Sequence, residues 1–244
     1  MIKAIETVYN GYRFRSRLEA RWAVFFDAIG IKYEYEPEGY EYKNVLSDGP
    51  ETYRWLPDFR LPNEDGLLIE VKGSDEALKK DWKRLYSAVD SCQTPASNGL
   101  MILGDIPNPD DVRDGCFPAF TYMYHFVNTE TGYQGTNFCE AMFSEGFPIN
   151  LSDWGNGVGG RTDFRHVARG ILEISQVLTL VNIANSREQI HASYDWRETM
   201  ENISSRSYLL STFPFPSDTL KAAYAMARQA RFEHGETPKV SRVS

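Results

Sequence analysis

Residues 53–73 read YRWLPDFRLPNEDGLLIEVKG, and this stretch decides the fold. Two apolar runs that are typical of β-strands flank PNEDG, whose proline, asparagine, aspartate and glycine favour a tight connection. The pattern therefore predicts an antiparallel hairpin. If its turn is centred on Glu64, residues at equal distances on either side are paired, and Asp58 lies directly opposite Glu70.

The two facing carboxylates suggest a metal site. Opposed like charges destabilise a strand pair, and Asp58 and Glu70 both lie in apolar runs, where an unpaired charge is costly. A bridging Mg²⁺ would offset the repulsion, and the main-chain carbonyl of Val71 is a further candidate ligand. Lys72 leaves the strand on the same face as Glu70, so it can position or deprotonate a metal-bound water, or pair with a phosphate.

The hairpin is embedded in an alternation of helices and strands. Apolar spacing predicts a helix over residues 13–30 that ends at Gly30, and an amphipathic helix from Ser74 to Cys92. The prolines of DIPNPDD mark a boundary, which divides the chain into residues 1–106 and 107–244. The other expected elements are strands in 31–44 broken near 37–39, a loop at 45–52, a buried strand in 98–106, strands in 117–133, a flexible connection at 155–160, and helices at 163–185 and 217–235.

Pro57-Asp58 followed by Glu70-Val71-Lys72 resembles the PD-(D/E)XK nuclease superfamily, over roughly the first 106 residues. The resemblance implies an α/β fold with a restriction-endonuclease-like core: an αβββαβ order and a central mixed sheet flanked by helices, here followed by a mainly helical C-terminal extension. It also implies Mg²⁺- or Mn²⁺-dependent cleavage of phosphodiester bonds in DNA. The likeness is closest to phage, transposase-subunit and junction-resolvase branches, and AYAMARQARFEHGE (223–236) is similar to the C-terminal end of actinobacterial and bacteriophage proteins with this core.

Glu19 has two interpretations. In many members of the superfamily a glutamate of the first helix is an additional metal ligand, and Glu19 occupies that place. Ser16 and Glu19 also form the sequence pattern of a capping box, in which the glutamate bonds back to the start of its own helix. Both interpretations stay open.

The charge balance is unusual for a protein that binds nucleic acid. The formal net charge is −8, although phosphate neutralisation by basic residues normally supplies much of the affinity for DNA. Basic residues cluster locally, and they are candidate phosphate contacts or simply the solvated faces of helices. These candidates are Arg13, Arg15, Arg17, Lys79, Lys80, Lys83 and Arg84.

Several other classes of protein are disfavoured. The chain has neither a long apolar run nor a signal-peptide pattern at its start, so a cytoplasmic protein with no membrane partner is expected. Scattered cysteines (Cys92, Cys116, Cys139) and histidines (His125, His166, His191, His234) suggest neither an iron–sulfur cluster nor a zinc site.

DNA is the expected partner, and a protein partner bound through residues 107–244 and a homodimer remain open. The alternative function is a non-catalytic, phage-encoded regulator or inhibitor that retains the nuclease fold and binds a protein. The acidic net charge motivates it. RNA or a nucleotide as substrate of the same site is a third hypothesis.

Overall fold

The computed structural model describes residues 5–63, 66–110, 120–127, 134–143, 150–152, 218–232, 238–240 and 242. The expected connection at 155–160 and the expected helix at 163–185 lie outside these residues. So do Cys116, His166, His191 and His234.

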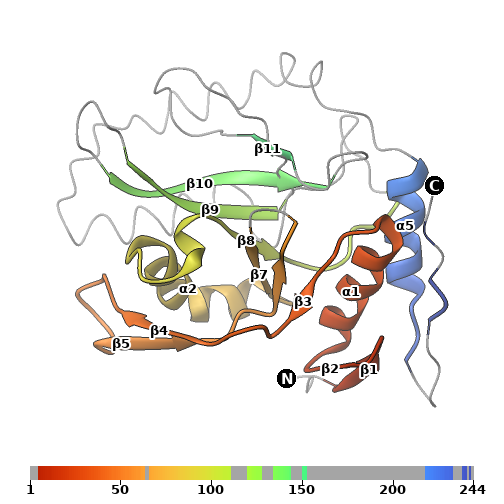
Figure 1. The fold of residues 1–244 in the computed structure, drawn as a ribbon, viewed down its shortest axis with the longest axis horizontal. Coiled ribbons are helices and arrows are strands. Elements are labelled where there is room, and N and C mark those ends of the chain that lie inside the picture. Colours follow the sequence, from red (N-terminus) through yellow and green to blue (C-terminus); the bar gives the residue numbers. More distant parts are fainter. Residues whose placement is uncertain are drawn as a thin grey trace.

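Seven strands of the described part of the chain form a mixed sheet (Figure 1). Strands β7 and β8 are parallel, whereas the other neighbouring strands are antiparallel. The prediction of an α/β protein with a mixed central sheet is therefore confirmed. In spatial order the strands are β11 (Asn150–Ser152), β10 (Gln134–Met142), β9 (Phe120–Val127), β8 (Leu100–Leu103), β7 (Leu67–Val71), β6 (Phe59–Leu61) and β3 (Glu34–Tyr35).

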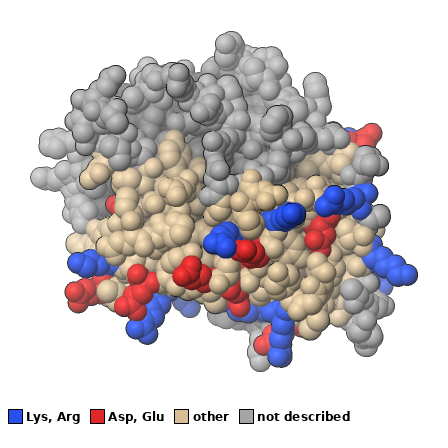
Figure 2. Space-filling model, in the orientation of Figure 1, with Lys and Arg blue, Asp and Glu red and all other residues tan. Residues whose placement is uncertain are grey.

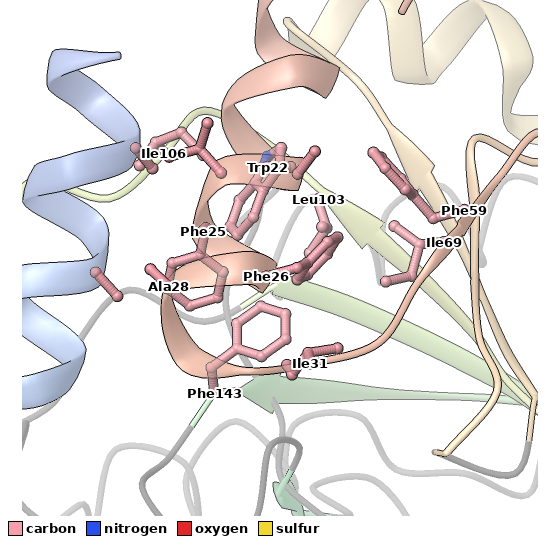
Figure 3. Close-up of a cluster of buried hydrophobic side chains, with 14 of the residues drawn as sticks. Trp22, Phe25, Phe26, Ala28, Ile31, Phe59, Ile69, Leu103, Ile106 and Phe143 are labelled. Carbon is pink, nitrogen blue, oxygen red and sulfur yellow. The ribbon is translucent and has the colours of Figure 1, made fainter. Parts of the chain in front are cut away.

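Helices cover both faces of this sheet. Helices α1 (Arg17–Ile29) and α5 (Asp218–Gln229) lie side by side on one face, and α2 (Asp75–Asp90) lies on the other (Figure 1). Because side chains alternate along a strand, Ile69 joins the core beneath α1 and Leu68 joins the core beneath α2. Figure 3 shows Trp22, Phe25 and Phe26 of α1 gathered with Phe59, Ile69 and Leu103 of the sheet.

Both predicted helices of the first hundred residues are present, and local signals set their ends. The Ser16 hydroxyl accepts the Glu19 N–H at 3.2 Å at the start of α1, and the Ser74 hydroxyl accepts the Ala77 N–H at 3.2 Å at the start of α2. Gly30 ends α1 with φ of 78°, a left-handed conformation that glycine adopts without steric cost. The helix starts four residues later than predicted, because residues 12–14 form a strand.

The predicted hairpin register is confirmed. Phe59 pairs with Ile69 and Leu61 with Leu67, which is the pairing expected for a turn centred on Glu64. The run from Tyr53 to Leu61 is not one strand, however. It contains β5 (Thr52–Trp55), which pairs with β4 (Tyr40–Lys43) in a separate sheet, and then β6. Pro57 lies at the break, and a proline has no N–H to donate to a continuing strand ladder.

An additional hairpin precedes α1. Strands β1 (Thr7–Tyr9) and β2 (Tyr12–Phe14) are joined by Asn10 and Gly11, both with positive φ, as a tight two-residue turn requires. A short 3₁₀ helix, η1 (Pro95–Ser97), precedes β8.

The sheet continues beyond residue 106. Strand β9 pairs with β8, and α5 packs against α1, so the described residues of the second half extend the same sheet and the same core. In the part of the chain that the structure describes, no helix is long and apolar enough to cross a membrane.

Candidate active site

A cavity of about 700 Å³ opens where the N-terminus of α1, the two strand hairpins and α2 meet. The two hairpins are β4–β5 and β6–β7. The predicted site residues Glu19, Asp58, Glu70, Val71 and Lys72 all line this cavity. The fold therefore brings together residues that lie on separate elements.

Asp58 lies immediately before β6 and is buried, with 5% of its surface exposed. One carboxylate oxygen, Oδ2, accepts the N–H of Val71 at 2.6 Å, and the other, Oδ1, pairs with Arg15 at 2.7 Å. Burial and the negative charges of Glu70 and Glu19 raise the pKa of Asp58 well above its usual value, and the contacts with Val71 and Arg15 offset only part of this effect. The surroundings of Asp58 are therefore short of positive charge.

Glu70 is also buried, with 4% of its surface exposed, and both of its oxygens have partners. The indole N–H of Trp55 donates to Oε2 at 2.7 Å. Lys72 Nζ lies 2.7 Å from Oε1, and Arg84 Nη2 lies 3.2 Å from the same atom. Glu70 is thus held by the β4–β5 hairpin on one side and by α2 on the other.

Asp81 of α2 completes a ring of charges with Glu70. Its Oδ2 lies 2.5 Å from Lys72 Nζ and 2.8 Å from Arg84 Nη2, so both cations connect the same two carboxylates. Burial alone would lower the pKa of Lys72, but the charge of Glu70 and the hydrogen bond to Asp81 raise it. Lys72 is therefore an ammonium group, a donor for an oxygen of water or phosphate.

Asp81 is held in its ionised form by the same contacts. Burial opposes this, but the hydrogen bond and the charge of Lys72, followed by the charge of Arg84, lower the pKa of Asp81 overall. The ring therefore contains two carboxylates and two cations, and it is neutral.

Glu19 is tied to the start of its own helix and also faces the cavity. Oε1 accepts the hydroxyl hydrogen of Ser16 at 2.6 Å, and Oε2 accepts from the Tyr35 hydroxyl at 2.6 Å and from the Arg15 N–H at 3.1 Å. These contacts match the capping interpretation, with the N–H of Arg15 in place of that of Ser16. Its position in the cavity wall leaves the ligand interpretation open.

Only two of the predicted phosphate contacts belong to the cavity, namely Arg15 and Arg84. Arg13 is exposed and paired with Glu6, and Lys83 is paired with Asp48. The remaining candidates, Arg17, Lys79 and Lys80, lie on α1 or α2 and do not line the cavity. On the face that Figure 2 shows, basic and acidic side chains of the described residues alternate and form no broad basic patch.

Trp55, Asp81 and Glu36, which contact the predicted side chains or their partners, are among the residues that the sequence did not predict. A buried tryptophan requires an acceptor for its N–H, but the pattern does not say which one. Asp81 is an acidic residue within a basic helix, and only its spacing of three residues from Arg84 indicated an ion pair. Glu36 pairs with Arg15 Nε at 2.5 Å and has φ of 46°, a conformation that carries no sequence signal for a glutamate.

The donor set fits a divalent cation that binds few protein ligands. Among the described residues, five acidic and four basic side chains line the cavity. Mg²⁺ commonly binds one or two carboxylates and keeps several waters, which suits the facing pair Asp58 and Glu70. Within the described residues, no group of three or more histidine, cysteine, aspartate or glutamate side chains is arranged to hold a metal ion. A cation here would therefore rest on two carboxylates and the main chain of Val71.

Among the cysteines and histidines, the structure describes the surroundings of Cys92 and His125. Cys92 is an exposed free thiol. His125 lies 3.7 Å from Asp90, and its Nδ1 is buried without a hydrogen bond.

No protein-family model matches this chain, and searches of curated proteins and of solved structures gave no match either.

Proposed function

We propose that this protein hydrolyses phosphodiester bonds in DNA with the help of Mg²⁺ or Mn²⁺ held by Asp58 and Glu70. One observation carries the proposal: two buried carboxylates face a common cavity beside three cationic side chains, Arg15, Lys72 and Arg84. The raised pKa of Asp58 supports it: burial and then the charges of Glu70 and Glu19 disfavour the ionised form, and a bound cation would offset these effects.

Each residue has a role that follows from its contacts. A bound divalent cation supplies a more acidic water and neutralises charge on the phosphate. Lys72 donates hydrogen bonds to a phosphate oxygen or to the attacking water, and the guanidinium groups of Arg15 and Arg84 suit phosphate oxygens. Trp55 fixes the orientation of Glu70 through its N–H.

Cleavage assays with plasmid, single-stranded, duplex and branched DNA test the proposal, each in Mg²⁺, Mn²⁺ and EDTA. We expect metal-dependent cutting by the wild type and a loss of about 100-fold or more in Lys72→Ala, comparable to removal of a donor that stabilises transition-state charge. Lys43→Ala is the matched control, because Lys43 is an exposed lysine of β4 that does not line the cavity. Absence of cutting on all four substrates, or equal rates in EDTA, would refute the proposal.

A second candidate function is a non-catalytic regulator that retains the nuclease-like core and binds a protein through residues 107–244. The observation in its favour is that all four carboxylate oxygens of Asp58 and Glu70 already accept hydrogen bonds from the protein. Titration with Mn²⁺ separates the two functions. If the protein is a nuclease, the wild type binds Mn²⁺ and Asp58→Ala does not. If it is a regulator, the wild type and Asp58→Ala bind Mn²⁺ equally weakly.

A further inference from the structure

Within the described residues, each cation that contacts Asp58 or Glu70 also contacts a second carboxylate. Arg15 places Nη2 2.7 Å from Asp58 Oδ1 and Nε 2.5 Å from Glu36 Oε1. Lys72 divides its contacts between Glu70 and Asp81, at 2.7 Å and 2.5 Å. The same two acids share Arg84, at 3.2 Å and 2.8 Å.

The second carboxylates are firmly placed. Glu36 has φ of 46°, a left-handed conformation that is strained for a glutamate, and its N–H donates to the main-chain oxygen of Asp58 at 2.9 Å. Asp81 lies within the 16-residue helix α2, one turn from Arg84. Neither residue depends on Asp58 or Glu70 side-chain contacts for its own position.

We propose that Glu36 and Asp81 are positioning residues, which keep Arg15, Lys72 and Arg84 at the cavity when a divalent cation takes their places on Asp58 and Glu70. This inference rests on the proposed nuclease function. The physical reason is that a cation displaced from its sole partner in a partly buried site loses both its ion pair and its hydrogen bonds. A second carboxylate removes most of that cost and leaves the side chain facing the phosphate.

The inference has a specific consequence for Arg15. Without Glu36, Arg15 has only the Asp58 carboxylate as its ionic partner, so it competes more strongly with a metal ion for that group. Without Arg15, Glu36 has no cation to hold, and its carboxylate no longer matters for metal binding. The effects of the two residues on metal affinity should therefore depend on each other.

Calorimetric titration of the full chain with Mn²⁺, in the absence of DNA, tests this coupling. We expect Glu36→Gln to raise the Mn²⁺ dissociation constant about two- to fivefold, the range of a partly exposed ion pair, and Arg15→Gln to lower it. In the Arg15→Gln background, Glu36→Gln should have no further effect. Glu34→Gln is the matched control, since Glu34 lies two residues away and pairs at 2.6 Å with Arg60, which, unlike Arg15, does not line the cavity.

Two results would overturn the inference. If Glu36→Gln weakens Mn²⁺ binding equally with and without Arg15, its carboxylate acts only through its negative charge. If Glu36→Gln and Glu34→Gln change the Mn²⁺ dissociation constant equally, Glu36 does not act as a positioning residue. If the wild type binds no Mn²⁺ and cuts no DNA, the proposed function is wrong as well as this inference. If the wild type cuts DNA but the variants give either of the two results above, only this inference is wrong.

The role of Asp81 is tested through the kinetics of DNA cleavage. Asp81→Asn should raise the KM for DNA by a several-fold larger factor than that by which it lowers kcat. Without the Asp81 carboxylate, Lys72 and Arg84 pair with Glu70 alone and no longer face the phosphate. Asp81→Glu should restore much of the wild-type KM, and thermal melting of each variant confirms that it is folded. An Asp81→Asn protein with wild-type KM would contradict the role of Asp81.

Discussion

Replacing Trp55 by phenylalanine removes the N–H that donates to Glu70 Oε2 at 2.7 Å, while an aromatic ring remains in place. Trp55 and Glu70 are 2% and 4% exposed, so water does not easily replace the lost donor. A hydrogen bond to a charged group contributes about 1.5–3 kcal/mol to folding. That is a large share of the roughly 5–15 kcal/mol by which a typical domain is stable.

A double-mutant cycle isolates this hydrogen bond from the loss of ring volume. Urea unfolding gives the free energy of unfolding of the wild type, Trp55→Phe, Glu70→Met and the double variant, in which Met keeps the length of the side chain without an acceptor. We expect an interaction energy of about 1.5–3 kcal/mol between the two sites. Either substitution should lower the free energy of unfolding by less in the background of the other than in the wild type.

Trp22 provides the matched control for the cycle. It is a second buried tryptophan, but its N–H donates to the main-chain oxygen of Gly104 at 2.8 Å. Trp22→Phe and Glu70→Met should therefore be additive to within about 0.5 kcal/mol. An interaction energy below about 0.5 kcal/mol for Trp55 and Glu70 would refute the assignment of Trp55 as the residue that holds Glu70.

Three further predictions concern stability. Asp58→Asn should abolish metal-dependent cutting. Its amide nitrogen cannot accept a hydrogen bond as the second carboxylate oxygen does, but the variant should gain stability relative to the wild type as the pH rises. Burial and neighbouring carboxylates raise the pKa of Asp58, so its contribution to stability is complete below its unfolded pKa and is lost as the pH rises through the folded value, whereas asparagine cannot ionise. Urea unfolding should show this gain growing with pH, and an equal gain at every pH would contradict it. Tyr35→Phe should cost about 1–2 kcal/mol through the lost bond to Glu19, and Tyr40→Phe, whose hydroxyl makes only an exposed contact of 3.5 Å, should cost much less in the same assay. Gly30→Ala should lower the unfolding free energy by about 1 kcal/mol because of the left-handed cap, and an unchanged midpoint would count against that role.

Local chemistry accounts for the elements that were predicted correctly. The hydroxyls of Ser16 and Ser74 cap the starts of α1 and α2, and the left-handed backbone of Gly30 ends α1 where the sequence predicts it. The register of β6 and β7 follows from a short turn, which leaves the two strands little choice of pairing. That register is the reason why two carboxylates could be expected to face each other.

Tertiary packing decided the rest of the candidate site. Pro57 marks a break after the strand of Trp55, but nothing near Trp55 in the chain indicates that its N–H reaches Glu70. Asp81 acquires Lys72 as a partner only when α2 packs beside the end of β7, and Glu36 acquires Arg15 only when the segment after β3 packs beside the residues that precede α1.

The sequence by itself therefore determined the class of fold, the two main helices of the first hundred residues and the pairing of the hairpin that carries Asp58 and Glu70. The tertiary structure alone decided which cations share those carboxylates, and that β9, β10 and α5 extend the sheet and its core. The physical reason is range: caps, turns and alternation act over a few residues, whereas ion pairs and sheet order depend on which distant segments bury their apolar faces together.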